Sequence, residues 1–286
     1  MNHRRTPLFC DAGLAERIER VERELIEAAA RSAHDRTANG RGFLIPVAGG
    51  LASFADDDSP YNKVVGLGFG GVPSAAELDE IERAYATCGA PVQVELPHLA
   101  DPEIALQLTT RDYRLESFEN VLGVALADGY DVVVPDGVEI RASGDDEFES
   151  WLEVMADAVA TPDTQGVPWR EEFPRDTYLA AERDAVSTGI ARYAAVREGV
   201  IAGGAGLRIT DAGIAQFASA ATTPAHRRRG IQSALVSMRL ADAATAGCNV
   251  GVITTQPGSK SQQNAQRSGF DLLYTRAVLV KGAGDE

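Results

Sequence analysis

Hydrophobic positions in the second half of the chain switch between helical and strand spacing in a fixed order. A helix is predicted over 145–160, because apolar residues recur there every three or four positions. These residues are Phe148, Trp151, Leu152, Met155 and Val159. A second helix reaching about residue 185 precedes three apolar runs, which are separated by short Gly-containing breaks and lie at 191–197, 200–209 and 214–222. Breaks of this kind favour antiparallel hairpins, and a strand over 138–142 opens the series.

The chain then runs from the last of these strands into another amphipathic helix, which begins at about Gly230. Its apolar stripe is Ile231, Ala234, Leu235, Met238 and Ala241. A strand over 248–255, a short helix over 261–268 and a final strand over 272–280 follow. The second half is therefore predicted to alternate strands and helices to its end.

The first half repeats the later part of this order. Its predicted elements are a helix over 11–30, a strand over 63–69, a helix over 77–88, a strand over 92–96, a helix over 101–110 and a strand over 113–126. Ser74 and Glu77 have the spacing of a capping box at the start of a helix. When Val92 is set against Val250, Tyr113 falls within one residue of Phe270. We infer two similar units, joined near 129–137.

The start of the helix at Gly230 favours anion binding. Unpaired backbone N–H groups and the positive end of the helix dipole attract anions there, and Gly230 lets a ligand approach the backbone. The run Arg227, Arg228 and Arg229 adds guanidinium groups that bind phosphate through two parallel hydrogen bonds. The sequence therefore predicts a pyrophosphate site, although three arginines before a helix also fit a solvated basic face.

This segment resembles the acyl-CoA pyrophosphate loop of the GNAT superfamily of acyl-CoA-dependent N-acyltransferases. The family signature is Arg/Gln-x-x-Gly-x-Gly/Ala after a strand that ends in x-Pro. Arg227, Gly230 and Pro224 fit the signature, whereas Gln232 stands where the family has Gly or Ala. The resemblance covers roughly 137–281 and includes the order of elements as well as the motif.

The resemblance implies an α+β fold of two tandem GNAT-like units, each a mixed, mostly antiparallel twisted sheet flanked by helices. Residues 1–135 would form a degenerate unit without a phosphate loop, because 70–77 contains no arginine. Residues 136–286 would form the unit that binds acyl-CoA.

The implied activity is transfer of an acetyl group from acetyl-CoA, used as co-substrate, to an amine of a small molecule by direct attack on the thioester. The implied CoA-binding residues are Ala221, Thr222, Arg227, Arg228, Arg229, Gly230, Ile231, Gln232, Ser233 and Asn264. The tyrosine that many relatives use as the acid falls here on Ala265, which leaves Tyr274 as the replacement or as a packed core aromatic. Candidate proton acceptors are Asp211, Glu171 and Glu172, although an ordinary surface charge explains each of them better.

Two other functions remain open from the sequence. Gln232 and the missing tyrosine favour a catalytically silent protein that binds or senses acyl-CoA. The run Gly66 to Gly71 matches the Gly-x-Gly-x-x-Gly fingerprint of dinucleotide-binding oxidoreductases. In that fold the third glycine packs where the helix opens, whereas Pro73 and Ser74 place this helix start beyond the glycines. A glycine-rich strand end explains the run better.

Composition narrows the partners. With 27 basic and 42 acidic residues the net charge is −15, which argues against nucleic acid and anionic membranes and would attract a cationic amine. No apolar stretch approaches a membrane span or a signal peptide, and the histidines and cysteines show no metal-ligand spacing. The thiols Cys10, Cys88 and Cys248 are expected to be free and buried, in the cytoplasm. The acceptor, the length of the acyl chain and a homodimer are left open.

Overall fold

The structure is a computed structural model that describes residues 6–126, 129–161, 167 and 174–283. The chain forms two compact units, each assembled from separate stretches of sequence. Unit 1 comprises 1–14, 120–169 and 191–274, and unit 2 comprises 15–119, 170–190 and 275–286. The domain boundary predicted between residues 135 and 136 stays a prediction.

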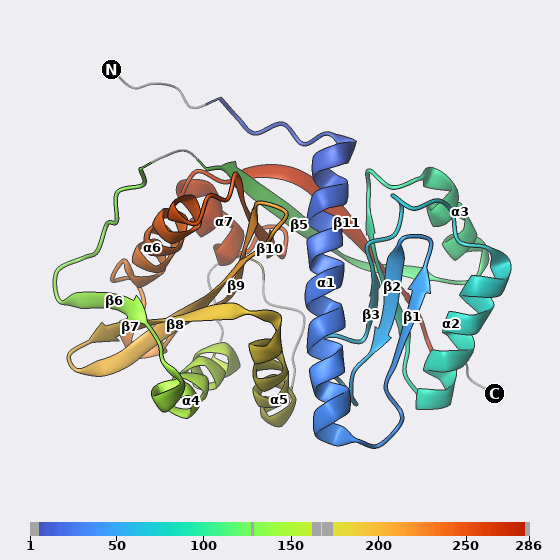
Figure 1. Cartoon of the computed structure of the whole chain (residues 1–286), viewed down its shortest axis with the longest axis horizontal. Helices are drawn as coiled ribbons and strands as arrows, with labels where there is room; N and C mark the ends of the chain where they lie inside the picture. Colours follow the sequence, from blue (N-terminus) through green and yellow to red (C-terminus); the bar gives the residue numbers. More distant parts are fainter. Residues whose placement is uncertain (1–5, 127–128, 162–166, 168–173, 284–286) are drawn as a thin grey trace. The chain divides into compact units, whose positions relative to one another are not determined.

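Unit 1 contains a mixed sheet with the strand order β5-β10-β9-β8-β7-β6. The strands are β5 (Arg114–Ala125, from Asn120 onward), β6 (Val138–Ala142), β7 (Ile190–Arg197), β8 (Val200–Ile209), β9 (Ile214–Thr222) and β10 (Val250–Thr255). The helices are η1 (Asp145–Glu147), α4 (Phe148–Ala160), η3 (Pro224–His226), α6 (Ile231–Thr245) and α7 (Lys260–Arg267). Only the β9–β10 pair is known to be parallel, and β5–β10, β8–β9 and β6–β7 are antiparallel. Figure 1 shows α6 and α7 on one side of these strands and α4 on the other.

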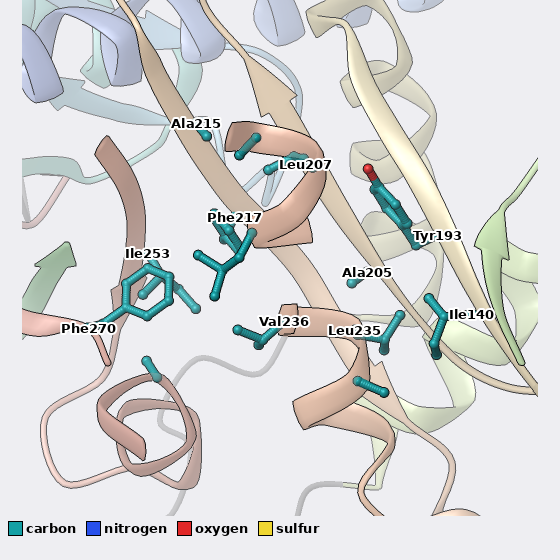
Figure 2. Packing of buried hydrophobic residues seen from close by; sticks show 14 of the residues in the cluster. Ile140, Tyr193, Ala205, Leu207, Ala215, Phe217, Leu235, Val236, Ile253 and Phe270 are labelled. Atoms are coloured by element: carbon teal, nitrogen blue, oxygen red, sulfur yellow. The ribbon is translucent and has the colours of Figure 1, made fainter. Parts of the chain in front are cut away.

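The two layers of unit 1 are fixed by apolar packing. On the side of α6 and α7, the rings of Phe217 and Phe270 meet edge to face with centroids 5.3 Å apart, close to Ile253 and Val236 in Figure 2. On the other side, the indole nitrogen of Trp151 on α4 donates a hydrogen bond to the Tyr193 carbonyl at 3.0 Å. Most of the stripes predicted for α4 and α6 are therefore buried, but Val159 is 42% exposed, so its predicted place in the stripe of α4 is wrong.

Unit 2 contains a second sheet, with the strand order β1-β2-β3-β4-β11. Its strands are β1 (Phe43–Val47), β2 (Gly50–Phe54), β3 (Lys63–Val65), β4 (Val92–Pro97) and β11 (Asp271–Lys281, from Thr275 onward). Its helices are α1 (Ala12–Thr37), α2 (Ala75–Cys88), α3 (Pro102–Thr110), α5 (Arg175–Ala185) and η2 (Val186–Thr188). In Figure 1, α1 lies on one side of β1–β3 and α2 and α3 lie on the other.

Each sheet contains a strand from the other half of the sequence. In unit 1, residues 120–125 of β5 pair with β10, so a strand of the N-terminal half completes the C-terminal sheet. In unit 2, residues 276–281 of β11 pair with β4. A sequence that repeats one plan twice therefore folds with its two last strands exchanged.

A buried ionic cluster holds β11 within unit 2. Arg276 is 1% exposed, and its Nε lies 2.8 Å from a carboxylate oxygen of Glu19 on α1. Its Nη1 lies 3.6 Å from Glu95 on β4 and 3.5 Å from Glu119, while Lys63 forms a second ion pair with Glu95. Burial raises the pKa of Glu95, but Lys63 and Arg276 outweigh burial and leave it below its ordinary value. A shift in the register of β11 would separate these charges inside the protein, so the cluster fixes the register.

The predicted fold class is confirmed, and most elements begin and end within two residues of their predicted limits. Three differences matter. The hairpin of β1 and β2 was not predicted, β3 ends at Val65 rather than at residue 69, and α1 extends to Thr37. All three cysteines are free as expected, but only Cys248 is buried, so the predicted burial of Cys10 and Cys88 is wrong.

Candidate functional site

The candidate site is the loop between β9 and α6, where the backbone turns twice through the left-handed region. Thr223 anchors the start of the loop, because its N–H and its hydroxyl both donate to the Ala202 carbonyl, at 2.9 and 3.0 Å. Arg228 then has φ +61° and Gly230 has φ +77°. Left-handed backbone is strained for a residue with a side chain, and such strain is concentrated at functional loops.

Gly230 leaves the first turn of α6 without a cap. It is the N-cap residue, no side chain accepts a hydrogen bond there, and no acidic residue lies in the first turn. The first helical hydrogen bond runs from Ala234 N–H to the Gly230 carbonyl at 3.0 Å, so Ile231, Gln232 and Ser233 carry N–H groups that precede the helical ladder. A Cβ on Gly230 would lie 2.7 Å from the Pro135 ring, which gives glycine a second reason besides its φ.

The three arginines have different environments. Arg227 is turned toward α4: its Nε donates to the Thr222 carbonyl and its Nη2 to the carbonyls of Ala158, at 3.1 Å in both cases, and Thr161. Arg228 and Arg229 are exposed, and neither forms a hydrogen bond or ion pair with any residue that the structure describes. Arg227 thus joins the loop to the end of α4, while Arg228 and Arg229 remain available to an anion.

Gln232 occupies the position at which the motif has Gly or Ala, and its side chain bonds within the protein. Its Nε2 donates to the Thr222 hydroxyl at 2.8 Å. This bond ties the first turn of α6 to the last residue of β9. The Gln232 side chain therefore bonds to Thr222 and does not cap the N–H groups of the first turn of α6.

Beside this loop the two parallel strands β9 and β10 separate. They pair only at residues 214–216 and 250–252, near their N-terminal ends. Beyond these positions β9 pairs with β8 alone, and β10 pairs with β5. The β9–β10 ladder therefore ends at Gln216, and the two strands diverge toward the end of the sheet where α6 begins.

β9 also carries a bulge in this region. Its residue Ala218 pairs with Gly206 and its residue Ala221 pairs with Gly204, so β9 has one more residue than β8 in between. Ser219 has φ +43° and Ala220 is exposed. A bulge turns backbone N–H and carbonyl groups away from the neighbouring strand.

Residues beyond the loop are placed as follows. Ser259 caps α7 by accepting a hydrogen bond from Gln262 N–H at 3.1 Å, as its position predicts. Asn264 is half-buried on α7, and the next residue, Ala265, is 2% exposed in the slot where relatives carry tyrosine. Tyr274 is 1% exposed on β11. Their roles toward CoA and in proton transfer stay predictions.

Only one of the three candidate proton acceptors lies within the described residues. Asp211 is exposed in the turn before β9, and Glu171 and Glu172 lie outside the described residues. One polar group that the sequence did not single out is the Thr255 hydroxyl at the open end of β10. Its oxygen is buried and has no hydrogen-bond partner among the described residues. In the sequence, Thr255 is distinguished only by its position at the end of an apolar run that predicts a strand.

The glycines at 66–71 have a structural explanation in unit 2. They form the loop between β3 and α2, and α2 begins at Ala75, four residues after Gly71. A Cβ on Gly70 would lie 2.6 Å from Gly49 Cα, and one on Gly68 would lie 2.1 Å from Ala100 Cβ. Close packing within unit 2 therefore requires glycine at positions 68 and 70.

Two classes of site are absent from the described part of the chain. No cluster of three or more His, Cys, Asp or Glu residues there could hold a metal ion. No described helix has the length and apolar character needed to cross a membrane.

Known proteins share this sequence region and this fold. Residues 151–270 match the family described as acetyltransferase (GNAT) family. No protein with a curated description matches the sequence.

Solved structures extend the likeness to the whole chain. A GCN5-related N-acetyltransferase from Kribbella flavida is 20% identical, with a TM-score of 0.63, over 90% of this chain and 96% of that one. Another from Sphaerobacter thermophilus is 13% identical, with a TM-score of 0.59, over 94% of each. A tandem GNAT protein from the clavulanic acid biosynthesis pathway, solved without acetyl-CoA, is 12% identical, with a TM-score of 0.62, over 98% of each. The predicted resemblance is thereby confirmed, and at these identities the solved structures show the fold.

Proposed function

Because residues 151–270 match the acetyltransferase (GNAT) family, we propose that the protein is an N-acyltransferase. It would transfer an acetyl group from acetyl-CoA to an amine of a small molecule by direct attack. The observation that carries the proposal is the start of α6. Its first turn has no cap and no acidic residue, and two arginines without partners among the described residues precede it.

The proposed CoA site follows from this geometry. N–H groups of Ile231, Gln232 and Ser233 and the side chains of Arg228 and Arg229 would bind the pyrophosphate. Arg227, Gly230, Ala221 and Thr222 would shape the loop, because they hold its backbone or end the strand before it. Asn264 on α7 would bond the pantetheine or the ribose-phosphate arm.

The separation of β9 and β10 suits the rest of the co-substrate. Pantetheine is an amide chain, so it could pair with β9 beyond Gln216, where β9 no longer pairs with β10. The thioester would then lie by the bulge at Ser219 and Ala220, where a backbone N–H can bind the carbonyl oxygen.

The chemical step needs no covalent enzyme intermediate. A neutral amine nitrogen attacks the thioester carbon and forms a C–N bond, which places negative charge on the oxygen. Collapse of this adduct breaks the C–S bond, and the sulfur leaves as a thiolate. The amine proton passes to water or to a carboxylate, and we propose that Tyr274 protonates the sulfur. A thiol has an ordinary pKa of about 8.5, so its anion leaves with modest help.

Two measurements test this function. Acetyl-CoA should raise the melting temperature of the protein more than NAD does, because a ligand that binds only the folded state stabilises it by mass action. A panel of primary amines should release free thiol from acetyl-CoA with at least one member. The proposal is wrong if the protein binds NAD in preference to CoA.

Tyr274→Phe tests the acid separately. If Tyr274 supplies the proton, turnover falls and the alkaline limb of the pH profile changes. An unchanged profile would show that Tyr274 is a packed core residue, as its burial also allows.

A silent acyl-CoA-binding protein is the second candidate. Gln232 bonded to Thr222 and Ala265 in the tyrosine slot are the observations that favour it. Stabilisation by acetyl-CoA without thiol release from any amine would support it. Free thiols are typical of a reducing compartment, so we propose a cytoplasmic location, which cell fractionation tests. A homodimer stays a prediction for sedimentation equilibrium.

A further inference from the structure

Arg239 lies in the middle of α6 and is 0% exposed. Its Nε donates to the Leu235 carbonyl of its own helix at 3.0 Å. Its Nη1 donates to two strand carbonyls, those of Gly206 on β8 at 2.9 Å and Ala218 on β9 at 3.4 Å. The guanidinium carbon lies 4.8 Å from the centre of the Phe217 ring. Arg239 therefore spans the layer between α6 and the sheet.

The charge of Arg239 has no carboxylate partner among the described residues. Its Nη2 is buried and makes no hydrogen bond with them. The ionisable group that interacts with Arg239 is Tyr193 on β7, whose hydroxyl donates to Asp242 on α6 at 2.6 Å. Burial lowers the pKa of Arg239 to about 9, so the side chain remains charged at neutral pH. Burying an apolar side chain in this core would cost less free energy than burying a charge, which indicates that the charge has a function.

The two strand carbonyls identify that use. Gly206 and Ala218 are paired with each other, and they are the last pair before the bulge of β9. Arg239 thus holds both strands at the point where the extra residue begins. The next residue on β9 is Ser219, with its left-handed backbone.

We propose that Arg239 is a positioning residue for acyl transfer, which holds the bulge so that a β9 N–H meets the thioester oxygen and whose charge stabilises the oxyanion. The proposal rests on the proposed function of this site. When the amine attacks, the carbonyl π electrons move to oxygen, and they return as the C–S bond breaks. A fixed positive charge on the α6 side of β9 lowers the energy of that intermediate, and it also favours the departing thiolate where Ala265 replaces the usual acid.

The test uses Arg239→Met, which keeps the length of the side chain and removes its charge and hydrogen bonds. We expect kcat to fall about tenfold to a hundredfold with less than a threefold change in the KM for acetyl-CoA. The melting temperature should stay the same or rise, because a buried charge without a carboxylate is removed. Arg239→Lys keeps the charge and should recover part of kcat. Leu240→Met, a buried neighbour on α6, is the packing control and should keep the wild-type kcat.

A spectroscopic readout separates positioning from packing. The infrared carbonyl stretch of bound ¹³C-acetyl-CoA should lie below that of the free thioester in the wild type and return toward the free value in Arg239→Met. The proposal would be overturned if Arg239→Met kept the wild-type kcat and the wild-type position of the bound carbonyl stretch, or if its activity fell only as far as its folded fraction. If the wild type neither binds acetyl-CoA nor releases thiol, the proposed function fails first and the role of Arg239 fails with it.

Discussion

Helices α2 and α6 begin in the same structural context but differ in how their first turns are capped. Each helix follows a loop after a strand that pairs in parallel with the next strand of its sheet. At α2, Ser74 is the N-cap, its hydroxyl accepts from Glu77 N–H, and the Glu77 carboxylate accepts from Ser74 N–H at 2.7 Å. At α6, the N-cap is Gly230, and the first turn has neither a cap nor an acid.

This difference would decide which of the two helix starts can bind an anion. The carboxylate of Glu77 neutralises the positive end of α2 and accepts the Ser74 N–H, while the Ser74 hydroxyl accepts the Glu77 N–H, so a phosphate would meet a like charge there. The first turn of α6 leaves the same groups open and adds Arg228 and Arg229. One residue of each helix, Glu77 or Ser233 at the third helical position, carries much of the contrast.

The largest effect on CoA binding is expected when the third position of α6 carries a glutamate, as the third position of α2 does. In Ser233→Glu, a carboxylate at the third helical position competes with pyrophosphate for the open N–H groups and repels it. We expect CoA affinity to fall a hundredfold or more, measured by calorimetry. The fold should be kept or slightly stabilised, because acidic residues favour a helix N-terminus.

The neutral counterpart is Ser233→Gln, which has the size of the glutamate but no charge. It should bind CoA within a few-fold of the wild type. Equal losses in both variants would mean that bulk rather than charge decides, and would remove the contrast with Glu77 as the explanation.

The second effect concerns the arginines. Replacing Arg228 and Arg229 together with alanine should weaken CoA binding about thirtyfold and flatten its dependence on salt, because two charge-assisted contacts are lost. The double lysine variant keeps the charges and should retain most of the salt dependence. Arg83→Ala, an exposed arginine of α2, is the matched control. Unchanged affinity in the alanine variant would remove the phosphate site from this loop.

Features set by residues close together in the sequence could be predicted from it, whereas features set by contacts between distant residues could not. The capping box at Ser74 and the start of α6 are local patterns, and both were read correctly from spacing. The exchange of β5 and β11 is not local, because similar apolar strands can complete either sheet. Its register depends on Arg276 meeting Glu19, a residue 257 positions away.

The same limit applies to the arginines of the site. The run at 227–229 reads as one motif, yet Arg227 bonds to carbonyls at the end of α4, which no spacing predicts. The sequence patterns did not single out Arg239, although its position in the helix is unusual. It follows Ile231 and Leu235 at four-residue steps, so it lies on the apolar stripe of α6, where a charged residue is unexpected.

The third effect is on stability alone. Ser74→Ala removes the cap of α2 and should cost unit 2 about 1 kcal/mol in its free energy of unfolding, measured in urea. CoA affinity should not change, because this helix start is not proposed to bind it. A loss of CoA affinity without loss of folded protein would mean that the two helix starts are not independent.

The smallest effect is a pH dependence at Glu77. The Ser74 hydroxyl and backbone N–H hold the pKa of the Glu77 carboxyl below its ordinary value. A carboxyl whose pKa is lowered by folding stabilises the protein above its unfolded pKa of about 4.3, and this contribution disappears as the pH falls through the folded value. Glu77→Gln should therefore be less stable than the wild type at pH 7, and the gap should close below about pH 4. Glu80→Gln, on the same helix, is the control, and a gap that persisted in acid would show that Glu77 acts on α2 by packing rather than by its charge.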